Sequence, residues 1–373
     1  MLLLIAHIVI CLCLLAAMLS VWLPPSVLPI PAWFGLAFEW LLMAEIVLGL
    51  LLLFTRRRRW AWLTVVMLVV CAAPVAYTVS HGALFFPKRE LPDSFTLMSY
   101  NTHLMGGSAK PKQNRIIQYI LRTQPDVVCL QEVEVHKSDD YLTLSELREA
   151  LNVYPYTYFD FKIYNSRRQY GNAVFSRYPL IGKHTLRYES KGNITSVCDI
   201  LLPNQKSNIQ NQTSSTDTLR LYINHLESNR VSLGSLAPTL SEAEKAVHEL
   251  SSTSDRLEKA SELRIRQAKV LRDDVARSPY PVLVVGDMNT TPVSYTYRIL
   301  QTNLRDAFLE SSNGNLGHTL AKRFGLPGTA GGRLNLGIRI DYILHSKNLQ
   351  ATDFDIPHVD YSDHYPILTT IHY

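Results

Sequence analysis

The strongest constraint on this 373-residue chain is a sharp change in composition near residue 80. The first 81 residues contain three long apolar runs, each close to the roughly 20 residues that a helix needs to cross a bilayer. The runs are Met1–Leu23, Ala32–Phe54 and Trp60–Val79. Buried helices of a soluble core are the alternative, but three successive runs almost without charge favour transmembrane helices. No Lys or Arg precedes Arg56, so the first run lacks the basic start of a secretory signal and we expect it to remain as a span.

Four consecutive arginines, Arg56 to Arg59, set the expected orientation, because cytoplasmic loops collect basic residues. This loop and the N-terminus are then inside, and everything after Val79 is outside. We therefore expect an integral protein of the inner or plasma membrane whose large domain faces the periplasm or the exterior. Glu39 and Glu45 lie in the second run without a Lys or Arg neighbour. Intramembrane carboxylates are functional candidates, and the plainer alternative is a protonated or snorkelling glutamate.

The remaining residues are numerous enough for one large domain with its own core. Only four of the 37 basic and two of the 32 acidic residues lie before residue 82, which leaves this part with a small positive charge and no sign of a strong nucleic-acid surface. We divide the chain into a membrane anchor at 1–81, a linker at 82–93 and one domain at 94–373. Cys129 and Cys198 are the only cysteines of that domain. Without a CxxC pair or a Cys/His cluster, we expect two buried free thiols and no structural zinc site.

Short apolar runs alternate with polar turns and a few helices along the domain, which indicates an α/β fold with many strands. The expected strands are Phe95–Tyr100, Val127–Glu132, Asn172–Ser176, Ser196–Leu202, Leu219–Asn224, Val282–Gly286, Ile338–Leu344 and Pro366–Ile371. The expected helices are Gln113–Arg122, Leu144–Leu151, Glu242–Arg277, with a break near Ser251–Ser254, and Ser294–Leu300.

Polar clusters stand at the ends of five of these runs and within a sixth, where a rigid sheet can present side chains to a common cleft. They read SYNTH from Ser99, QEV from Gln131, NHLE from Asn224, GDMN from Gly286, RIDY from Arg339 and SDH from Ser362. Carboxylates and carboxamides are oxygen ligands for hard cations such as Mg²⁺ or Mn²⁺. A histidine with an aspartate is the pair that activates water. The inventory therefore indicates metal-assisted hydrolysis.

The order and wording of these clusters resemble the endonuclease/exonuclease/phosphatase family. The pieces SYN, LQEV, GNAVFSRYP, NHLE, GDMNTTP, RIDYIL and SDHYP occur in the family's order over about residues 94–373. The resemblance implies a four-layered α/β sandwich, two mixed β-sheets flanked by helices, here preceded by three transmembrane helices. It also implies a divalent-metal-dependent phosphodiesterase or phosphatase, with Mg²⁺ or Mn²⁺ as the cofactor.

The resemblance also assigns roles to matching positions. Metal ligands would be Glu132, Asn101 and Asp363; catalytic residues would be His364, Asp341, Asp287, Asn289 and His225; Asn172 would face the substrate. In these roles Asp341 orients His364, while Asp287 and Asn289 hold the phosphate and the attacking water. Plainer alternatives exist for single residues: Asp287 and Asn289 are turn formers, and Asp341 could pair with Arg339. The roles of His103 and Glu227 stay open.

The substrate is less constrained. Repair nucleases of this family usually carry Lys two residues after the metal-binding Glu, where this chain has Glu134. That difference and the expected outside location weaken a DNA-repair function. A domain tethered to a bilayer meets lipid at high effective concentration, so we expect lipid head groups. Cleavage of extracellular DNA or RNA and a non-catalytic binding module are the alternatives. The expected partners are the membrane and a phosphate-ester substrate, and the sequence gives no sign of a protein partner.

Overall fold

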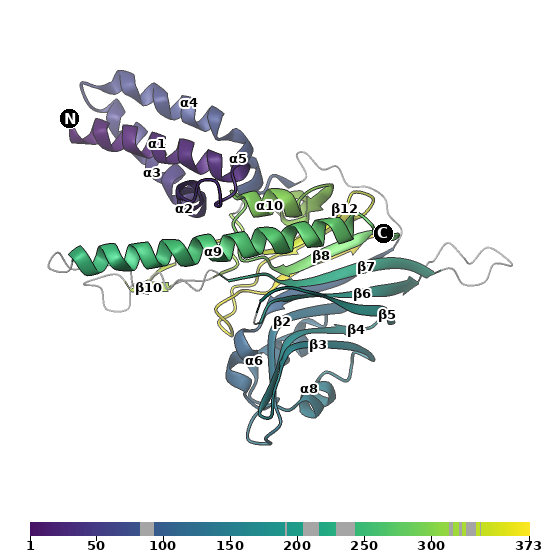
Figure 1. Ribbon diagram of the computed structural model, residues 1–373. Coiled ribbons are helices and arrows are strands. Elements are labelled where there is room, and N and C mark those ends of the chain that lie inside the picture. The colour runs from purple at the N-terminus through teal and green to yellow at the C-terminus, as the bar shows by residue number, and fades with distance from the viewer. Residues whose placement is uncertain are drawn as a thin grey trace, which may run out of the picture. The chain divides into compact units, whose positions relative to one another are not determined.

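The computed structural model describes residues 1–82, 93–190, 192–203, 216–228, 243–312, 316–320, 323–325, 333–335 and 337–373 (Figure 1). Contacts divide the chain into two compact units. The first unit holds Met1–Val79, Glu227–Val270 and Thr290–Leu300, and the second holds Ser80–Leu226, Leu271–Asn289 and Gln301–Tyr373. Most of the expected linker at 82–93 lies outside the described residues, and the division of the chain at residue 94 stays a prediction.

The first unit begins with apolar helices. They are α1 (Leu2–Trp22), α2 (Ile30–Leu36), α3 (Phe38–Leu53), the 3-10 helix η1 (Arg58–Ala61), α4 (Trp62–Val70) and α5 (Ala72–Thr78). Of these, α1 is by itself long and apolar enough to cross a membrane. The pairs α2–α3 and η1/α4–α5 reach that length only as bent pairs, with bends of 73° and 60°. The described helices therefore provide one to three candidate spans, where the sequence predicted three.

The bend in the third apolar run has an identifiable cause. Pro74 cannot donate a backbone hydrogen bond, and its ring clashes with the carbonyl group four residues earlier. That carbonyl belongs to Val70, the residue at which α4 ends. The chain passes through Cys71 and resumes as α5 at Ala72. The proline thus divides this run into two helices.

The second unit is built on two six-stranded mixed sheets flanked by helices. The first sheet has the order β13-β14-β1-β2-β4-β3. Its strands are β1 (Ser94–Asn101), β2 (Val127–His136), β3 (Tyr156–Tyr164), β4 (Arg168–Ser176), β13 (Gln350–Asp355) and β14 (Ile367–His372). The amphipathic helix α7 (Arg115–Thr123) and the short helix α8 (Leu144–Ala150) bury Ile116, Ile120 and Leu147 against this sheet, while α6 (His103–Ser108) follows β1.

The second sheet has the order β5-β6-β7-β8-β12-β9. Its strands are β5 (Leu180–Arg187), β6 (Ile194–Pro203), β7 (Thr216–His225), β8 (Val282–Asp287), β9 (Leu304–Asp306) and β12 (Asp341–Ser346). Helix α11 (Ala307–Ser311) packs on β12 and β13. Strands β10 (Arg323–Gly325) and β11 (Arg333–Asn335) form a separate pair. Helix α10 covers Tyr295–Leu300, and α9 (Ala243–Val275) runs without the expected break near Ser251–Ser254, so that prediction was wrong.

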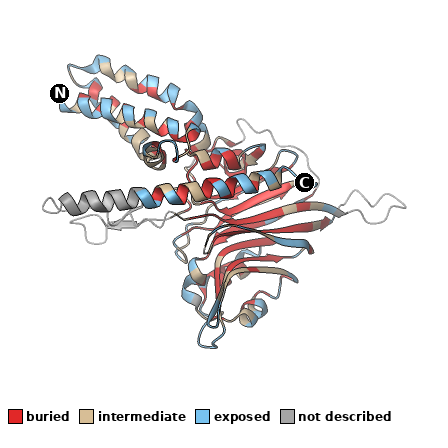
Figure 2. Cartoon of the chain, in the orientation of Figure 1, coloured by how far each residue is buried: buried red, intermediate tan, exposed pale blue. Residues whose placement is uncertain are grey.

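Each sheet has one parallel pair at its centre, β1 with β2 and β7 with β8, and these pairs contact each other. The central strands are buried along most of their length, as the red ribbons show (Figure 2). Parallel neighbours end at the same edge of a sheet, so the two pairs carry four strand ends into one region. Asn101, Glu132, His225 and Asp287 lie at or near these ends. The fold class predicted from the sequence is confirmed.

Candidate active site

Asn101 connects two carboxylates that come from different sheets. It is the last residue of β1, and its side-chain amide donates hydrogen bonds to Glu132 Oε1 at 3.1 Å and to Asp287 Oδ2 at 2.9 Å. Its Oδ1 accepts the backbone N–H of His103 at 3.1 Å, which fixes the orientation of the amide. Asn101 is buried, so these bonds persist without competition from water. The amide thereby holds the two carboxylates close to each other.

Glu132 occupies an irregular position in β2. The pairing of β2 with β4 shifts register between Leu130 and Val133, so the strand bulges at Gln131 and Glu132. Glu132 has φ +55°, a left-handed conformation that costs energy for a residue with a Cβ atom. The Thr102 hydroxyl donates to the carbonyls of Gln131 and Glu132 and stabilises the bulge. Bulges re-aim side chains at functional sites, and this one turns a strand residue toward Asn101.

Asp287 is held by the turn that follows β8. Its Oδ1 accepts the backbone N–H of Asn289 at 2.8 Å, and Asn289, at φ +50°, donates its side-chain amide to the carbonyl of Leu226 at 3.0 Å. Gly286, directly before Asp287, has φ +121°. A Cβ atom at Gly286 would lie 2.2 Å from the Asn224 carbonyl oxygen. Only glycine permits β7 and β8 to approach so closely. The turn-forming alternative and the site role are thus both compatible with the geometry of Asp287.

His364 and Asp341 form a buried pair. The Nδ1 atom of His364 lies 2.9 Å from Asp341 Oδ2, and its Nε2 lies 3.7 Å from Asp287 Oδ2. Asp341 begins β12 opposite Asp287 in the antiparallel register. Arg339 pairs with Asp306 at 2.6 Å instead of with Asp341. Asp341 therefore interacts with the histidine, as the resemblance implied, and not with the arginine.

Burial and charge shift the pKa values of this group in a consistent direction. Burial raises the pKa of Asp287 to about 6, and the neighbouring charge of Asp341 adds to the rise, while the imidazoles of His364 and His225 oppose it. Burial by itself lowers the pKa of His364, but the carboxylates of Asp341 and Asp287 outweigh it and raise this pKa to about 10. At neutral pH the metal-free site thus holds an imidazolium between carboxylates.

His225 and Tyr170 complete the site on the side of Glu132. His225 ends β7, and its Nε2 lies 3.4 Å from Glu132 Oε1. The Tyr170 ring lies 6.5 Å from the His225 ring, and its hydroxyl hydrogen-bonds to Glu132. Burial, followed by the charges of Glu132 and Asp287, raises the pKa of Tyr170, so its hydroxyl remains a donor. The sequence analysis did not single out Tyr170, which stands one residue before the motif GNAVFSRYP.

Two of the expected residues, Asp363 and Asn172, have other surroundings. Asp363 is half exposed, with its carboxylate 3.4 Å from His103 Nδ1 rather than among the buried carboxylates. Asn172 donates both amide hydrogens inside the unit, to Ser196 Oγ and to the carbonyl of Ile223, so it connects β4 with β6 and β7. Their roles in metal and substrate binding stay predictions. Glu227 belongs to the first compact unit.

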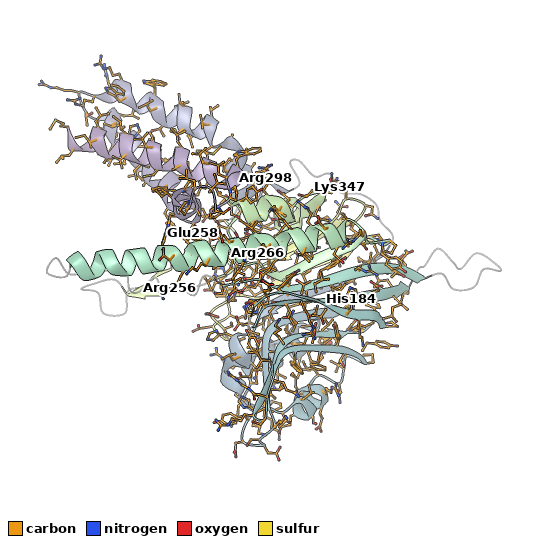
Figure 3. All side chains as sticks on the ribbon, in the orientation of Figure 1. His184, Arg256, Glu258, Arg266, Arg298 and Lys347 are labelled. Carbon is orange, nitrogen blue, oxygen red and sulfur yellow. The ribbon has the colours of Figure 1, made fainter. Side chains whose placement is uncertain are left out.

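Most other histidines of the domain lie away from this group. His184, for example, is exposed on β5, the edge strand of the second sheet (Figure 3). His345 is buried against Glu310, with Nε2 2.6 Å from Oε2. The convergence of His225 and His364 on the same carboxylates therefore distinguishes them from histidines that serve the surface or the core.

The residues present fit a divalent cation. Potential ligand atoms of Glu132, His225 and Asp287 lie within 4.8 Å of one another, and so do those of Asp287, Asp341 and His364. Glu132 and Asp287 supply the carboxylate oxygens that Mg²⁺ and Mn²⁺ prefer. Two carboxylates held side by side by one amide are also a site of unbalanced negative charge, which a cation neutralises.

The geometry agrees with a comparison of the sequence with protein families. Residues 98–364 match the profile of the Endonuclease/Exonuclease/phosphatase family. The chain belongs to this family. Its members generally use divalent metal ions and hydrolyse phosphoester bonds, and the chain is accordingly a hydrolase of that class. Residues 1–78 match a second profile, a domain of unknown function (DUF8431).

No curated protein matches the chain. Solved structures of weak overall similarity include an endonuclease/exonuclease/phosphatase from Beutenbergia cavernae, with 17% identity, a TM-score of 0.49 and coverage of 75% of this chain and 71% of the other. Truncated TDP2 from Caenorhabditis elegans has 15% identity, a TM-score of 0.45 and coverage of 75% and 98%. The human Nocturnin catalytic domain has 18% identity, a TM-score of 0.47 and coverage of 76% and 95%.

Proposed function

We propose that this chain is a divalent-metal-dependent phosphodiesterase, tethered to the membrane by residues 1–81, that cleaves the phosphate esters of lipid head groups at the outer face. The convergence of Glu132 from the bulge in β2, Asp287 from the end of β8 and His364 from the segment before β14 carries the catalytic part of the proposal. The apolar helix α1 supports the tether. Residues 94–373 would then form the catalytic domain.

Glu132 is the proposed principal ligand of a Mg²⁺ or Mn²⁺ ion, because its carboxylate offers the oxygen donors that these cations prefer. When bound, the cation neutralises charge on the phosphate and polarises its P–O bond. Asn101 keeps the carboxylates of Glu132 and Asp287 together through its amide. Asp363, half exposed beside His103, would join through solvent at the rim of the site.

The attack of water on phosphorus needs a group that accepts a proton and groups that tolerate growing negative charge. Asp287, whose pKa of about 6 leaves it ionised but basic at neutral pH, accepts the proton of the attacking water. Asn289 positions that water, since its backbone and amide are fixed to Asp287 and Leu226. A new P–O bond forms as the bond to the leaving oxygen breaks.

His364 enters the reaction protonated, because Asp341 and Asp287 raise its pKa to about 10. An imidazolium held by Asp341 stabilises the negative charge that grows on the phosphate oxygens. This proposed role differs from the activation of water that the sequence analysis expected of the Asp341–His364 pair. His225 and Tyr170 lie beside Glu132, where they donate hydrogen bonds to a phosphate oxygen.

The lipid substrate is supported by the tether. A domain fixed to a bilayer meets head groups at a high effective concentration without any added affinity. At the place where repair nucleases carry Lys, Glu134 interacts with Arg168 at 2.6 Å and with His136 at 3.1 Å. That acidic residue does not attract a nucleic-acid backbone. The proposed substrate is thus a phosphodiester at the membrane surface.

The test uses the purified full chain in lipid nanodiscs, with Mg²⁺ or Mn²⁺. Phospholipid and sphingolipid nanodiscs, single-stranded DNA, RNA and soluble inositol phosphates are supplied in parallel, and released phosphate or head group is measured. The proposal predicts metal-dependent release from lipid that the Glu132→Ala variant lacks. Turnover of nucleic acid alone would keep the phosphodiesterase and replace the lipid substrate. No metal-dependent turnover of any of them would support the binding-module alternative.

A further inference from the structure

A group of polar side chains is buried among the apolar helices of the first unit. His7 and Cys11 lie on α1, Glu45 on α3 and Thr64 on α4. His7 and Cys11 are four residues apart and so lie on the same face of α1. His7 and Glu45 are completely buried, and Cys11 is nearly so. Two helices thus bring a nitrogen, a sulfur and a carboxylate together where apolar packing is otherwise the rule, and a third helix, α4, adds the Thr64 hydroxyl.

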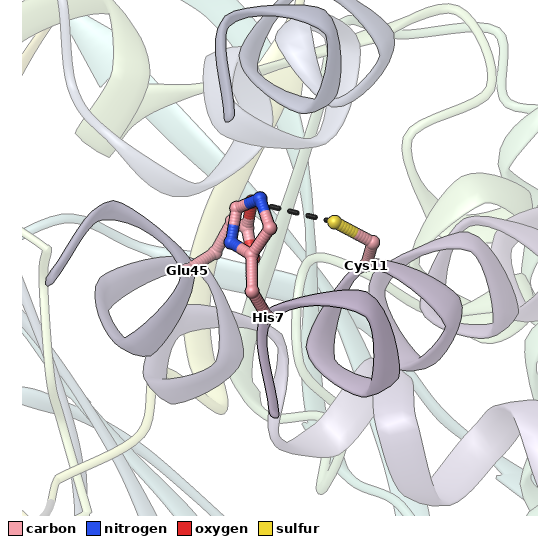
Figure 4. A group of neighbouring side chains, drawn as sticks. All are labelled: His7, Cys11 and Glu45. Atoms are coloured by element: carbon pink, nitrogen blue, oxygen red, sulfur yellow. Dashed lines mark hydrogen bonds and ion pairs between the residues drawn. The ribbon is translucent and has the colours of Figure 1, made fainter. Parts of the chain in front are cut away.

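The atoms of this group point toward one another (Figure 4). His7 Nδ1 lies 3.3 Å from Glu45 Oε2, and Cys11 Sγ lies 3.4 Å from Glu45 Oε1. One potential ligand atom from each of His7, Cys11 and Glu45 lies within 4.8 Å of the other two. Metal–ligand bonds of about 2.0–2.3 Å in a tetrahedron separate neighbouring ligand atoms by about 3.3–3.6 Å. The separations of 3.3 Å and 3.4 Å fall within that range.

The hydrogen bonding of the group is incomplete in the described part of the chain. Both ring nitrogens of His7 and Glu45 Oε2 are buried without a hydrogen-bond partner. Buried polar atoms are normally satisfied by protein or by water. Thr64 donates its hydroxyl to Glu45 Oε1 at 3.1 Å, so the carboxylate is oriented while its other oxygen faces His7. Two of the unsatisfied atoms, His7 Nδ1 and Glu45 Oε2, thus face each other inside the cluster.

The donor set indicates which ion would fit. A cysteine sulfur, a histidine nitrogen and a carboxylate oxygen are the three ligand types that zinc accepts in proteins. Hard cations such as Mg²⁺ prefer oxygen alone. A thiolate and a carboxylate carry two negative charges, and with a neutral imidazole they balance one Zn²⁺. A net charge of zero matters here because an unbalanced charge among apolar helices is costly.

We propose that His7, Cys11 and Glu45 form a zinc site within the N-terminal helices, with Thr64 holding the carboxylate in place. The ion would connect α1 with α3, and the Cys11 thiol would release its proton as the metal binds. The sequence had given no Lys or Arg partner for Glu45 and no zinc-type spacing. The partner of Glu45 is a histidine, and the proposed ligands come from two helices, so no local spacing in the sequence reveals the site. The site is independent of the proposed hydrolase.

The test measures metal in the purified full chain in detergent, after dialysis against a weak chelator, by elemental mass spectrometry. We expect one zinc per chain, and its loss in His7→Ala, Cys11→Ser and Glu45→Gln. Cys13→Ser is the matched control, because Cys13 lies on the same helix outside the cluster, and it should retain the zinc. Glu132→Ala, at the catalytic site, should retain it too.

Cobalt replacement supplies a second readout that does not depend on the variants folding. A thiolate bound to Co²⁺ gives a near-ultraviolet charge-transfer absorption, and only the N-terminal cluster has a cysteine ligand. Wild-type protein should show this absorption, and Zn²⁺ should protect Cys11 from alkylation until a strong chelator removes it. Wild-type protein that holds no zinc, shows no cobalt–sulfur absorption and loses no protection on chelation would overturn the proposal and leave a His7–Glu45 pair that shares a proton.

Discussion

The Nδ1 atom of His364 lies 2.9 Å from an oxygen of Asp341. Both side chains are buried, and the two residues are 23 positions apart in the sequence. The Asp341 carboxylate holds the Nδ1 side of the ring and leaves Nε2 directed at Asp287. The orientation of the ring therefore depends on a residue that need not contact the substrate.

Replacing His364 with alanine should lower kcat by about 10²-fold or more, the usual scale for losing a group that stabilises charge in the transition state. Asp341→Asn should also lower kcat, because it loosens the ring and removes the charge that keeps it protonated. Turnover of the natural substrate is the measurement. His184→Ala, an exposed histidine of β5, is the matched control and should be neutral. Near-normal turnover of His364→Ala would show that the assigned role is wrong.

The raised pKa of His364 predicts a titration in the metal-free protein. A histidine with a folded pKa near 10 and an unfolded pKa of about 6.5 stabilises the fold below pH 6.5, and that contribution disappears as the pH rises toward 10. At pH 8 the ring should still be an imidazolium by NMR of histidine-labelled protein, with His364→Asn used to assign the signal. In Asp341→Asn the midpoint should fall by at least ~1 unit. A neutral ring at pH 8 in the wild type would contradict the assignment.

Removal of Glu132 should abolish metal-dependent turnover. We expect Glu132→Ala to lose roughly 10³-fold in kcat/KM, about 4 kcal/mol of transition-state stabilisation, and to keep its fold by circular dichroism. Excess chelator should give the same loss in the wild type, reversed by Mg²⁺ or Mn²⁺. Glu149→Ala serves as the control, because Glu149 is an exposed residue of α8. Full activity in chelator would refute metal dependence.

The sequence predicted the central strands better than the edges of the sheets. The strands it missed in the two large sheets, β3, β5, β9 and β13, all lie at an edge of their sheet. Edge strands are less buried, so they lack the apolar run that reveals a strand. β5 shows this clearly, with a burial pattern in which only Leu180 is fully buried. Central strands such as β8, buried at every position, were located to within one residue.

Most of the site could be named from the motifs, because each motif lies in or beside a buried strand. The sequence could not show that Asn101 donates to both Glu132 and Asp287, since that contact joins two sheets. It gave no sign of the left-handed conformation of Glu132, which arises from a bulge set by pairing with β4. Tyr170 was missed because an aromatic residue in a strand usually packs in the core.

The two cysteines of the domain should be inert in the folded protein. Cys129 and Cys198 are free and fully buried, which confirms the expectation from the sequence. Burial raises the pKa of Cys198 to about 12 and that of Cys129 well above its usual value, so neither forms the reactive thiolate. Peptide mapping after a water-soluble maleimide should show both unlabelled in native protein and both labelled in denaturant. Labelling of Cys198 in the native protein would contradict its burial.

Topology gives the last prediction, and it depends on the number of spans being odd. If neither bent pair crosses the membrane, the chain has one span, and if both cross, it has three. In both, the N-terminus and the C-terminus lie on opposite sides of the bilayer. With three spans, the arginines Arg56 to Arg59 stay cytoplasmic because moving them across is costly. An alkaline phosphatase fused after Tyr373 should then be active, and a fluorescent protein that matures only in the cytoplasm should be dark.

The predicted topology depends most on whether the helices on either side of the bend near Pro74 cross the membrane together. If η1, α4 and α5 turn back without crossing while α2 and α3 still cross as a pair, two spans remain and the C-terminal domain returns to the cytoplasm. Replacing Pro74 with alanine restores a backbone donor and should favour one continuous helix. The reporter result should therefore be the same in Pro74→Ala and in the wild type if the third run already crosses. A cytoplasmic signal in the wild type that switches sides in Pro74→Ala would refute the outer-face location and make cytoplasmic nucleic acid an accessible substrate.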